Sequence, residues 1–400
     1  MAENSTITVL SDPLVNDYGS ARPALLVAEA LARKAPVDLV ALRISPRLQG
    51  RLRESGVRPI DLGVPAPPGS QSVGYLLDWM ITPFHSSRVA DLVPSGPNVL
   101  NFSNTLISPC AAWFAQGTIA QTLEGIFPCL EVHHKIAARF SLPLVRLLER
   151  GYLGRFIAAS RLIVANSGFD RDIYRTLGIR VDGVIPPPVD THRYAPSTDS
   201  PSRDYVLAYI GKETDLEALY GVAKQGIPIR AFGAKLESAV RYLRDLPQVQ
   251  LLGHLTEEEL VAAYSNARFT LFPFTAEPFG YVPVESMACG TPVLTYGTQG
   301  PSETVRQGVT GWLTGSREEL VSRAKQLWEQ GAPIARMSAA CVEVAKEFDT
   351  LRVADRWVGL LAEPHPYAAW SKLPAPRAVP RAHGVLPSEG HVSRPGPGIG

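Results

Sequence analysis

Short apolar runs alternate with amphipathic segments of helix length along most of the chain. Residues 7–10 have the pattern of a buried strand, and Pro23 opens a segment whose apolar positions recur with the helical period. Further strands are predicted at residues 37–42, 98–102, 162–165, 205–210, 229–232, 249–252, 269–272 and 292–295. Strands that alternate with helices in this way are typical of parallel sheets with crossover helices, so the expected fold class is α/β.

The chain is too long for one hydrophobic core, so more than one domain is expected. It has 400 residues, and single cores stop growing at roughly 250–300 residues. The polar, Pro/Ser-rich run at residues 194–203 carries no periodic element, and it places a boundary near residue 198. The last 37 residues hold eight prolines and five glycines. We therefore expect domains at 1–198 and 199–348, and a disordered tail at 364–400.

Composition and charge narrow the class of protein. Hydrophobic residues make up 45% of the chain and charged residues 19%, which excludes global disorder. The formal net charge is +1, so no strong field invites nucleic acid as a partner. The N-terminus lacks the pattern of a signal peptide, and no window is apolar enough to span a membrane. A cytoplasmic location is expected, at most peripheral to the inner face of the membrane.

No metal site or other cofactor is expected. Cys110, Cys129, Cys289 and Cys341 lie far apart in the sequence, without the close ligand pairs of a zinc site or the density of a disulfide framework. Asp170 and Asp172 have the spacing of a metal-binding acidic pair. They fall at a predicted helix start, however, where acids are favoured by the helix dipole.

The segment 139–161 is basic and amphipathic, and it has two interpretations. Five arginines punctuate an apolar helical pattern. Basic amphipathic helices can lie on anionic membrane surfaces, which would make this segment a peripheral membrane contact. The alternative is a core helix whose arginine stems cover its solvent side, and the sequence favours this second interpretation.

Residues 249–315 carry the candidate chemistry. Thr256 and Glu259 form a predicted capping box at the start of a helix, and the strand 269–272 follows. A loop then carries Glu277 and ends at Gly280, and the next helix carries Glu285. In open α/β sheets, ligands bind in the crevice beyond the carboxyl ends of the strands.

Two glutamates therefore flank a predicted helix start. Main-chain amides at a helix start form an anion site, and the glycine between the glutamates lets a ligand approach the backbone. A carboxylate can also accept hydrogen bonds from a vicinal diol. Together these groups fit a sugar nucleotide, although glutamate pairs at this spacing are also common on solvated surfaces.

The stretch Glu277-Pro-Phe-Gly-Tyr-Val-Pro-Val-Glu285 resembles the E-x7-E signature of retaining glycosyltransferases of family 4. Residues 162–174 and 185–190 resemble the end of the N-terminal domain and the approach to the linker in that family. The resemblance extends from about residue 157 to residue 313. It implies the GT-B fold, in which two doubly wound Rossmann-like domains face across a cleft, and a segment at 349–363 that crosses back to the first domain.

The resemblance also implies roles for residues of the second domain. Glu277 would contact the hydroxyls of the transferred sugar, the main chain of Phe279, Gly280 and Tyr281 would bind the sugar and the diphosphate, and Glu285 would bind the ribose. The family usually places an arginine and a later lysine on the diphosphate. Here Lys212 stands in the arginine position, and no lysine follows at the expected place.

The first domain holds three further candidates, Gly19 for the donor and Gln116 and His133 for the acceptor side. Gly19 lies in the loop that would face the donor and acceptor. Gln116 stands where family members carry a histidine, on a stretch, 112–117, expected as the loop after a strand. His133 is a further candidate for the cleft.

The expected activity is metal-independent transfer of a hexose, with retention, from a nucleotide-diphosphate sugar to a hydroxyl acceptor. That acceptor would be a glycan, a lipid-linked compound or a small molecule. Glu277 and Lys212 would be the catalytic residues. A sugar-nucleotide epimerase of the same architecture and a non-catalytic nucleotide-sugar-binding protein stay open as alternatives.

Overall fold

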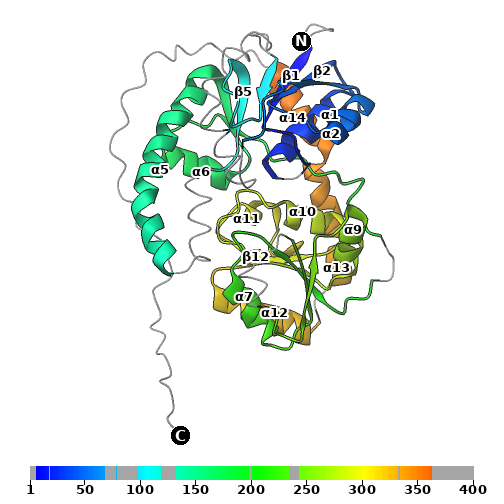
Figure 1. The fold of residues 1–400 in the computed structure, drawn as a ribbon. Coiled ribbons are helices and arrows are strands. Elements are labelled where there is room, and N and C mark those ends of the chain that lie inside the picture. The colour runs from blue at the N-terminus through cyan, green and yellow to red at the C-terminus, as the bar shows by residue number, and fades with distance from the viewer. Residues whose placement is uncertain are drawn as a thin grey trace.

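Two parallel sheets, each flanked by helices, form the upper and lower lobes of the molecule (Figure 1). This computed structural model describes residues 6–17, 19–67, 78, 98–118, 132–197, 201–233, 243–331 and 334–362. The named strands pair in parallel register throughout both sheets, as alternation of strands and helices predicts.

The first sheet has seven strands in the order β3-β2-β1-β4-β5-β6-β7. Its strands are β1 (Ile7–Ser11), β2 (Val37–Ala41), β3 (Val57–Asp61), β4 (Val99–Asn101), β5 (Cys110–Ala115), β6 (Ser160–Ala165) and β7 (Gly183–Val184). The central strands β1, β4 and β5 are buried along their whole length. Burial on both faces is the usual state of a parallel sheet covered by helices.

Helices cover both faces of the first sheet. One core contains side chains of α1 (Arg22–Leu31), α2 (Pro46–Glu54) and α14 (Thr350–Ala362). The other contains side chains of α5 (Val132–Ala159) and α6 (Gly168–Thr176). Helix α14 therefore packs against α1 in the first lobe (Figure 1). It follows the second lobe in the sequence, so the chain returns to the first lobe at its end.

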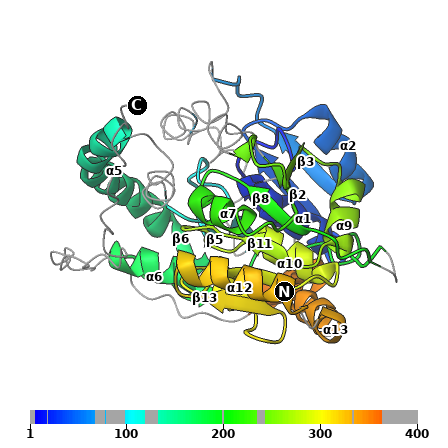
Figure 2. The same ribbon diagram turned by 90° about the horizontal axis from the view of Figure 1, so that it is seen from below.

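The second sheet has six strands in the order β10-β9-β8-β11-β12-β13. Its strands are β8 (Val206–Ile210), β9 (Ile229–Gly233), β10 (Val249–Gly253), β11 (Thr270–Phe272), β12 (Val293–Tyr296) and β13 (Gly311–Thr314). Its helices are α7 (Leu216–Ala223), α9 (Glu257–Asn266), α10 (Tyr281–Ala288), α11 (Pro301–Thr304), α12 (Arg317–Glu329) and α13 (Ile334–Ala345). Figure 2 views this lobe from below, with α10 close to α1 of the first lobe.

The order of strands reverses once in each sheet. In the first sheet the reversal lies between β1 and β4, and in the second between β8 and β11. Loops that leave neighbouring strands at such a point diverge and open a crevice, which is where doubly wound sheets bind ligands. Lys212 follows β8 and Glu277 follows β11, so both predicted catalytic residues leave the second sheet at its switch point.

The expected α/β fold of GT-B type is confirmed, and each predicted strand is present with small changes at its ends. Four strands were missed, namely β3, β5, β7 and β13. The expectation of a loop at 112–117 was wrong for Ala112–Ala115, which belong to β5, and Gln116 follows this strand directly. The exact domain limits stay predictions, and the expected tail at 364–400 lies outside the described residues.

Candidate functional site

The loop after β11 delivers Glu277 to the start of α10. Gly280 is the N-cap of this helix and has φ 85°, a left-handed conformation that favours glycine. The Glu277 carboxylate bends back over the helix start, where its Oε1 accepts hydrogen bonds from the amides of Phe279, at 3.3 Å, and Gly280, at 3.0 Å. Glu277, the predicted sugar ligand, therefore accepts from main-chain amides of the predicted anion site.

A second loop, after β12, holds the Glu277 loop in place. The Glu277 amide donates to Gln299 Oε1 at 2.7 Å, and the Gly300 amide donates to the Glu277 carbonyl at 3.0 Å. A Cβ atom at Gly300 would lie 1.9 Å from the Pro278 carbonyl oxygen, so no other residue fits this close crossing. Gln299 and Gly300 were missed in the sequence, where only the glycine gave a local signal.

Burial and a neighbouring carboxylate raise the pKa of Glu277. Desolvation is the larger cause, and the charge of Glu213 adds to it, whereas the amides of Phe279 and Gly280 act in the opposite direction. The result is a pKa of about 7. Glu277 thus changes its charge in the physiological range, which is unusual for a carboxyl group and frequent at functional sites.

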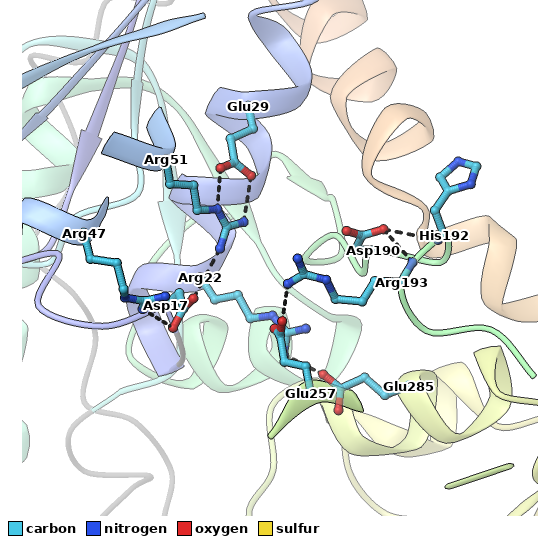
Figure 3. Close-up of polar contacts among 10 residues, drawn as sticks. All are labelled: Asp17, Arg22, Glu29, Arg47, Arg51, Asp190, His192, Arg193, Glu257 and Glu285. Atoms are coloured by element: carbon cyan, nitrogen blue, oxygen red, sulfur yellow. Dashed lines mark hydrogen bonds and ion pairs between the residues drawn. The ribbon is translucent and has the colours of Figure 1, made fainter. Parts of the chain in front are cut away.

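Glu285 lies one helix turn further into α10 and is buried in an ion pair between the lobes. Its Oε1 accepts from Arg22 Nη1 at 2.5 Å, and its Oε2 accepts from the Tyr264 hydroxyl at 3.1 Å. The pair is visible in Figure 3, where Arg22 reaches down from α1 toward α10. The Glu285 residue is only 3% exposed, so in this arrangement a ribose diol could not reach its carboxylate without a movement of Arg22.

Aromatic rings enclose the guanidinium of Arg22. It lies 4.5 Å from the ring centroid of Tyr281 and 5.7 Å from that of Tyr194. Although burial by itself would lower the pKa of Arg22, the Glu285 carboxylate raises it beyond the usual range. The Tyr281 hydroxyl is buried and finds no hydrogen-bond partner among the described residues. Arg22 was not anticipated, because nothing near it in the sequence indicates a partner that is 263 positions away.

Lys212 is exposed on the turn that follows β8. The turn is closed by a hydrogen bond from the Gly211 amide to Thr214 Oγ1 at 2.8 Å. It pairs with the loop after β11 through a bridge between Thr214 and Phe274. The structure therefore brings the Lys212 turn beside the loop that carries Glu277, as the switch-point geometry predicts.

Across the cleft, Gln116 follows β5 and its side-chain amide donates to the Phe102 carbonyl at 3.2 Å. Two side chains of α6 hold the following residue, Gly117, by hydrogen bonds to its main chain. Asp170 Oδ2 accepts from the Gly117 amide at 2.7 Å, and the Tyr174 hydroxyl donates to the Gly117 carbonyl at 3.0 Å. Burial raises the pKa of Asp170 to about 7, and the charge of Glu277 contributes to this shift. Asp170 is thus a structural anchor of this loop.

The start of α6 is capped from the second lobe. Glu303 of α11 accepts from the amides of Gly168, at 2.7 Å, and Phe169, at 2.6 Å. A carboxylate at a helix start is stabilised by the unpaired amides and by the helix dipole. The Glu303 contact and the Arg22–Glu285 pair therefore connect the two lobes through two different helices of the second lobe, α11 and α10.

The other predicted site residues lie in the first lobe. Gly19 starts a short 3-10 turn with φ 69°, next to Asp17, which pairs with Arg47 at 2.9 Å and Arg51 at 3.2 Å. His133 lies in α5, and its side chain is outside the described part of the structure. In the described ranges, no three acidic, histidine or cysteine side chains gather as a metal site would require.

A charged recess opens beside Arg22, between the lobes. Its lining contains three arginines and three acids, and Figure 3 shows many of these side chains. The lining residues are Asp17, Arg22, Leu25, Leu26, Arg51, Asp190, Arg193, Tyr194 and Glu257. Neither Glu277 nor Lys212 lines the recess. Arg22 does line it, and because Arg22 pairs with Glu285, the recess lies at the Glu285 end of the candidate site.

Comparison with known proteins shows that the site lies in a segment that matches a glycosyltransferase family model. Residues 234–348, which contain Glu277 and Glu285, match the model of the family "Glycosyl transferases group 1". Solved structures share the fold over most of the chain. The protein HepE from Anabaena, solved with UDP and glucose, is 16% identical with a TM-score of 0.62, and the match covers 89% of this chain and 99% of that one.

A second structural relative is the sucrose-phosphate synthase of Thermosynechococcus elongatus. It is 16% identical with a TM-score of 0.66, over 88% of this chain and 98% of that one. The chain therefore has the GT-B fold, and a segment of its second lobe matches the glycosyltransferase group 1 family model.

Among curated proteins, the D-inositol 3-phosphate glycosyltransferase of Nocardiopsis dassonvillei is 29% identical over 265 residues, or 56% of this chain. The chain spans about half the length of the curated relatives that it matches. In the described residues, no helix is both long enough and apolar enough to cross a membrane.

Proposed function

We propose that this protein is a retaining glycosyltransferase of family 4 that transfers a hexose from a nucleotide-diphosphate sugar to a hydroxyl acceptor without a metal. The observation that carries the proposal is the arrangement at the switch point of the second sheet. There a carboxylate, two helix-start amides and a lysine leave neighbouring strands. A buried carboxylate, Glu285, lies on the same helix. The family match of this segment supports it.

In this proposal, Glu277 binds the sugar. Both of its amide hydrogen bonds go to Oε1, so Oε2 is the atom that we assign to the sugar hydroxyls. Because the amides of Phe279 and Gly280 donate to Glu277 Oε1, we assign the Tyr281 main-chain amide, the next one at the start of α10, to the diphosphate. Glu285 accepts from the ribose diol after Arg22 has moved away from it. Gly19 and Gln116 border the same cleft from the first lobe.

The chemical step follows from the groups at hand. The bond between the anomeric carbon and the diphosphate oxygen breaks, and the acceptor oxygen bonds to the same face of that carbon. The acceptor's proton passes to the leaving diphosphate, so no protein base is consumed. Negative charge grows on the diphosphate as its bond breaks, and Lys212 with the amides at the α10 start stabilises that charge.

The acceptor is proposed only as a hydroxyl compound. Inositol 3-phosphate is a sensible first compound to test, because curated relatives bear its name. The epimerase alternative requires acid and base groups at the sugar ring. Glu277 and Asp170 have a pKa near neutrality, which keeps this alternative in the test. The non-catalytic alternative rests on the missing second cation for the diphosphate.

The experiment is a thermal-shift screen of UDP-, GDP- and ADP-sugars, since a ligand that binds the native state raises its stability. Each sugar that binds is then incubated with hydroxyl acceptors, with and without EDTA, and the products are examined by NMR. A glycoside with retained anomeric configuration in both reactions supports the proposal. An isomerised sugar supports the epimerase, binding without turnover supports the non-catalytic protein, and inhibition by EDTA contradicts metal independence.

A further inference from the structure

The ring of Tyr209 lies in a slot between two glycines of the second sheet. Tyr209 belongs to β8, Gly211 follows this strand, and Gly233 ends the neighbouring strand β9. A Cβ atom at Gly211 would lie 2.9 Å from Cε1 of the ring, and a Cβ atom at Gly233 would lie 2.6 Å from Cε2. A side chain at either position would therefore displace the ring. Gly233 also has φ 121°, a conformation that favours glycine.

The slot determines the direction in which the Tyr209 hydroxyl points. Gly211 follows Tyr209 in β8, and Gly233 pairs with Ile210, which also follows Tyr209. The two Cε atoms, which adjoin the carbon that carries the hydroxyl, both lie beside these later positions. The ring therefore leans toward the carboxyl ends of β8 and β9. Its hydroxyl extends to the edge of the sheet at which the switch point opens the crevice.

Aromatic neighbours hold the Tyr209 ring in this orientation. Phe274 stacks on it, with ring centroids 5.6 Å apart and an angle of 14° between the planes. Phe232 of β9 packs against it at 5.2 Å and 49°. Because Phe274 belongs to the loop that carries Glu277, the ring stands beside both loops that leave the switch point, the Lys212 turn and the Glu277 loop.

The half-buried Tyr209 hydroxyl is a neutral donor, and it makes no hydrogen bond within the part of the chain that the structure describes. Burial raises its pKa, and the charges of Glu277, Glu213 and Glu285 raise it further, in that order. The phenol therefore keeps its proton at neutral pH. Because the influence of a charge falls with distance, the order places the hydroxyl nearer to Glu277 than to Glu285.

We propose that the Tyr209 hydroxyl donates a hydrogen bond to the phosphate next to the sugar in the nucleotide-sugar donor. This inference rests on the proposed function, in which Glu277 binds the sugar and Glu285 binds the ribose, so that the diphosphate lies between them. Gly211, at the edge of the ring, directly precedes Lys212, the cation assigned to the diphosphate. Tyr209 thereby supplies a second side-chain donor to the diphosphate, where no second lysine follows Lys212 at the expected place.

Calorimetric titration of the full chain with the nucleoside diphosphate that the thermal-shift screen selects tests this proposal. Tyr209→Phe keeps the ring in its slot and removes only the hydroxyl, so the affinity should fall about 10-fold. The free energy of unfolding should not change, because the hydroxyl has no partner among the described residues. The matched control is Tyr220→Phe, which removes the hydroxyl of a half-buried tyrosine of α7 that the proposed site does not use. It should bind as the unaltered chain does.

A second titration locates the hydrogen bond on the donor. The nucleoside monophosphate lacks the phosphate next to the sugar, so Tyr209→Phe should bind it as the unaltered chain does. Equal losses with both nucleotides, an equal loss in the control or a lower stability of Tyr209→Phe would each overturn the proposal. An unaltered chain that binds no nucleoside diphosphate would refute the proposed function itself, whereas diphosphate binding that Tyr209→Phe leaves unchanged would refute only this inference.

Discussion

The buried pair between Arg22 and Glu285 makes the ribose assignment testable, because the same carboxylate has a structural contact and a proposed ligand contact. The two side chains are 16% and 4% exposed. Removal of one partner from a buried pair leaves an uncompensated charge and costs about 3–5 kcal/mol of stability. Glu285→Gln and Arg22→Gln should therefore each lower the stability of the native state, and the double variant should lose about 1–3 kcal/mol less than the sum.

Donor binding should separate the two residues. Glu285→Gln removes the charged acceptor of the ribose diol, and a hydrogen bond to a charged group contributes about 1.5–3 kcal/mol, which corresponds to a loss of affinity of about 10- to 150-fold. Arg22→Gln should bind the nucleotide as tightly as the unaltered chain or more tightly. The reason is that the diol no longer has to displace a guanidinium from the carboxylate.

The assay is calorimetric titration of both single variants and the double variant with the nucleoside diphosphate that the thermal-shift screen selects. Denaturation curves of these three variants and of the unaltered chain give the stability of each. We expect the double variant to bind as weakly as Glu285→Gln. If Arg22→Gln loses as much affinity as Glu285→Gln, the loss comes from disturbing the buried pair, and Glu285 is not the ribose ligand.

Four other outcomes are expected. Lys212→Ala should lower kcat about 30- to 1000-fold with a smaller change in KM, while Lys212→Arg retains activity; near-normal kcat in steady-state kinetics would place another cation on the diphosphate. Because ionised Glu277 accepts hydrogen bonds from hydroxyls more strongly than its protonated form does, calorimetry should show donor affinity rising as pH increases through about 7, and Glu277→Gln should flatten this profile. The pKa of Glu277 is higher in the folded chain than in the unfolded chain, so the free energy of unfolding of the ligand-free chain should fall as pH rises from 4.5 to about 7. Glu277→Gln should remove this fall, and an equal fall in the variant would refute the assignment. Glu303→Gln should cost about 1 kcal/mol in thermal unfolding by weakening the cap on α6, and the surface variant Glu329→Gln should cost less; equal costs would mean that the cap contributes nothing.

The sequence pattern was sufficient where structure is determined locally. The capping box of Thr256 and Glu259 is present as predicted, with both reciprocal hydrogen bonds. Gly280 and Gly290 bound α10 as expected, because both have the positive φ that favours glycine. The predicted strands followed from apolar runs, and the parallel sheets followed from their alternation with helices, whereas the doubly wound order was implied by the family resemblance. Glu277 could be placed at the start of α10 for the same reason.

Contacts between distant segments could not be predicted. Arg22 lies in the first turn of α1, where nothing in the local sequence indicates a buried carboxylate in the other lobe. Glu303 is separated from the amide of Gly168 by 135 positions. Both contacts depend on how the lobes are placed against each other, which is decided by packing over the whole interface. The sequence therefore indicated Glu277 and Glu285 as candidates, but it gave no sign of the contacts that Arg22 and Glu303 make between the lobes.

Helix α5 shows a second limit of pattern reasoning. Its apolar residues form two stripes, one with Phe140, Leu144 and Leu147 and the other with Tyr152 and Phe156. Periodicity predicts a helix from either stripe, but it does not say which stripe meets a core, since both satisfy the same spacing. Only the tertiary contacts of Tyr152 and Phe156 with the first sheet decide the matter, and they bury one stripe while the other stays in water. Which side of this helix is buried therefore follows from the fold and not from the sequence of the helix.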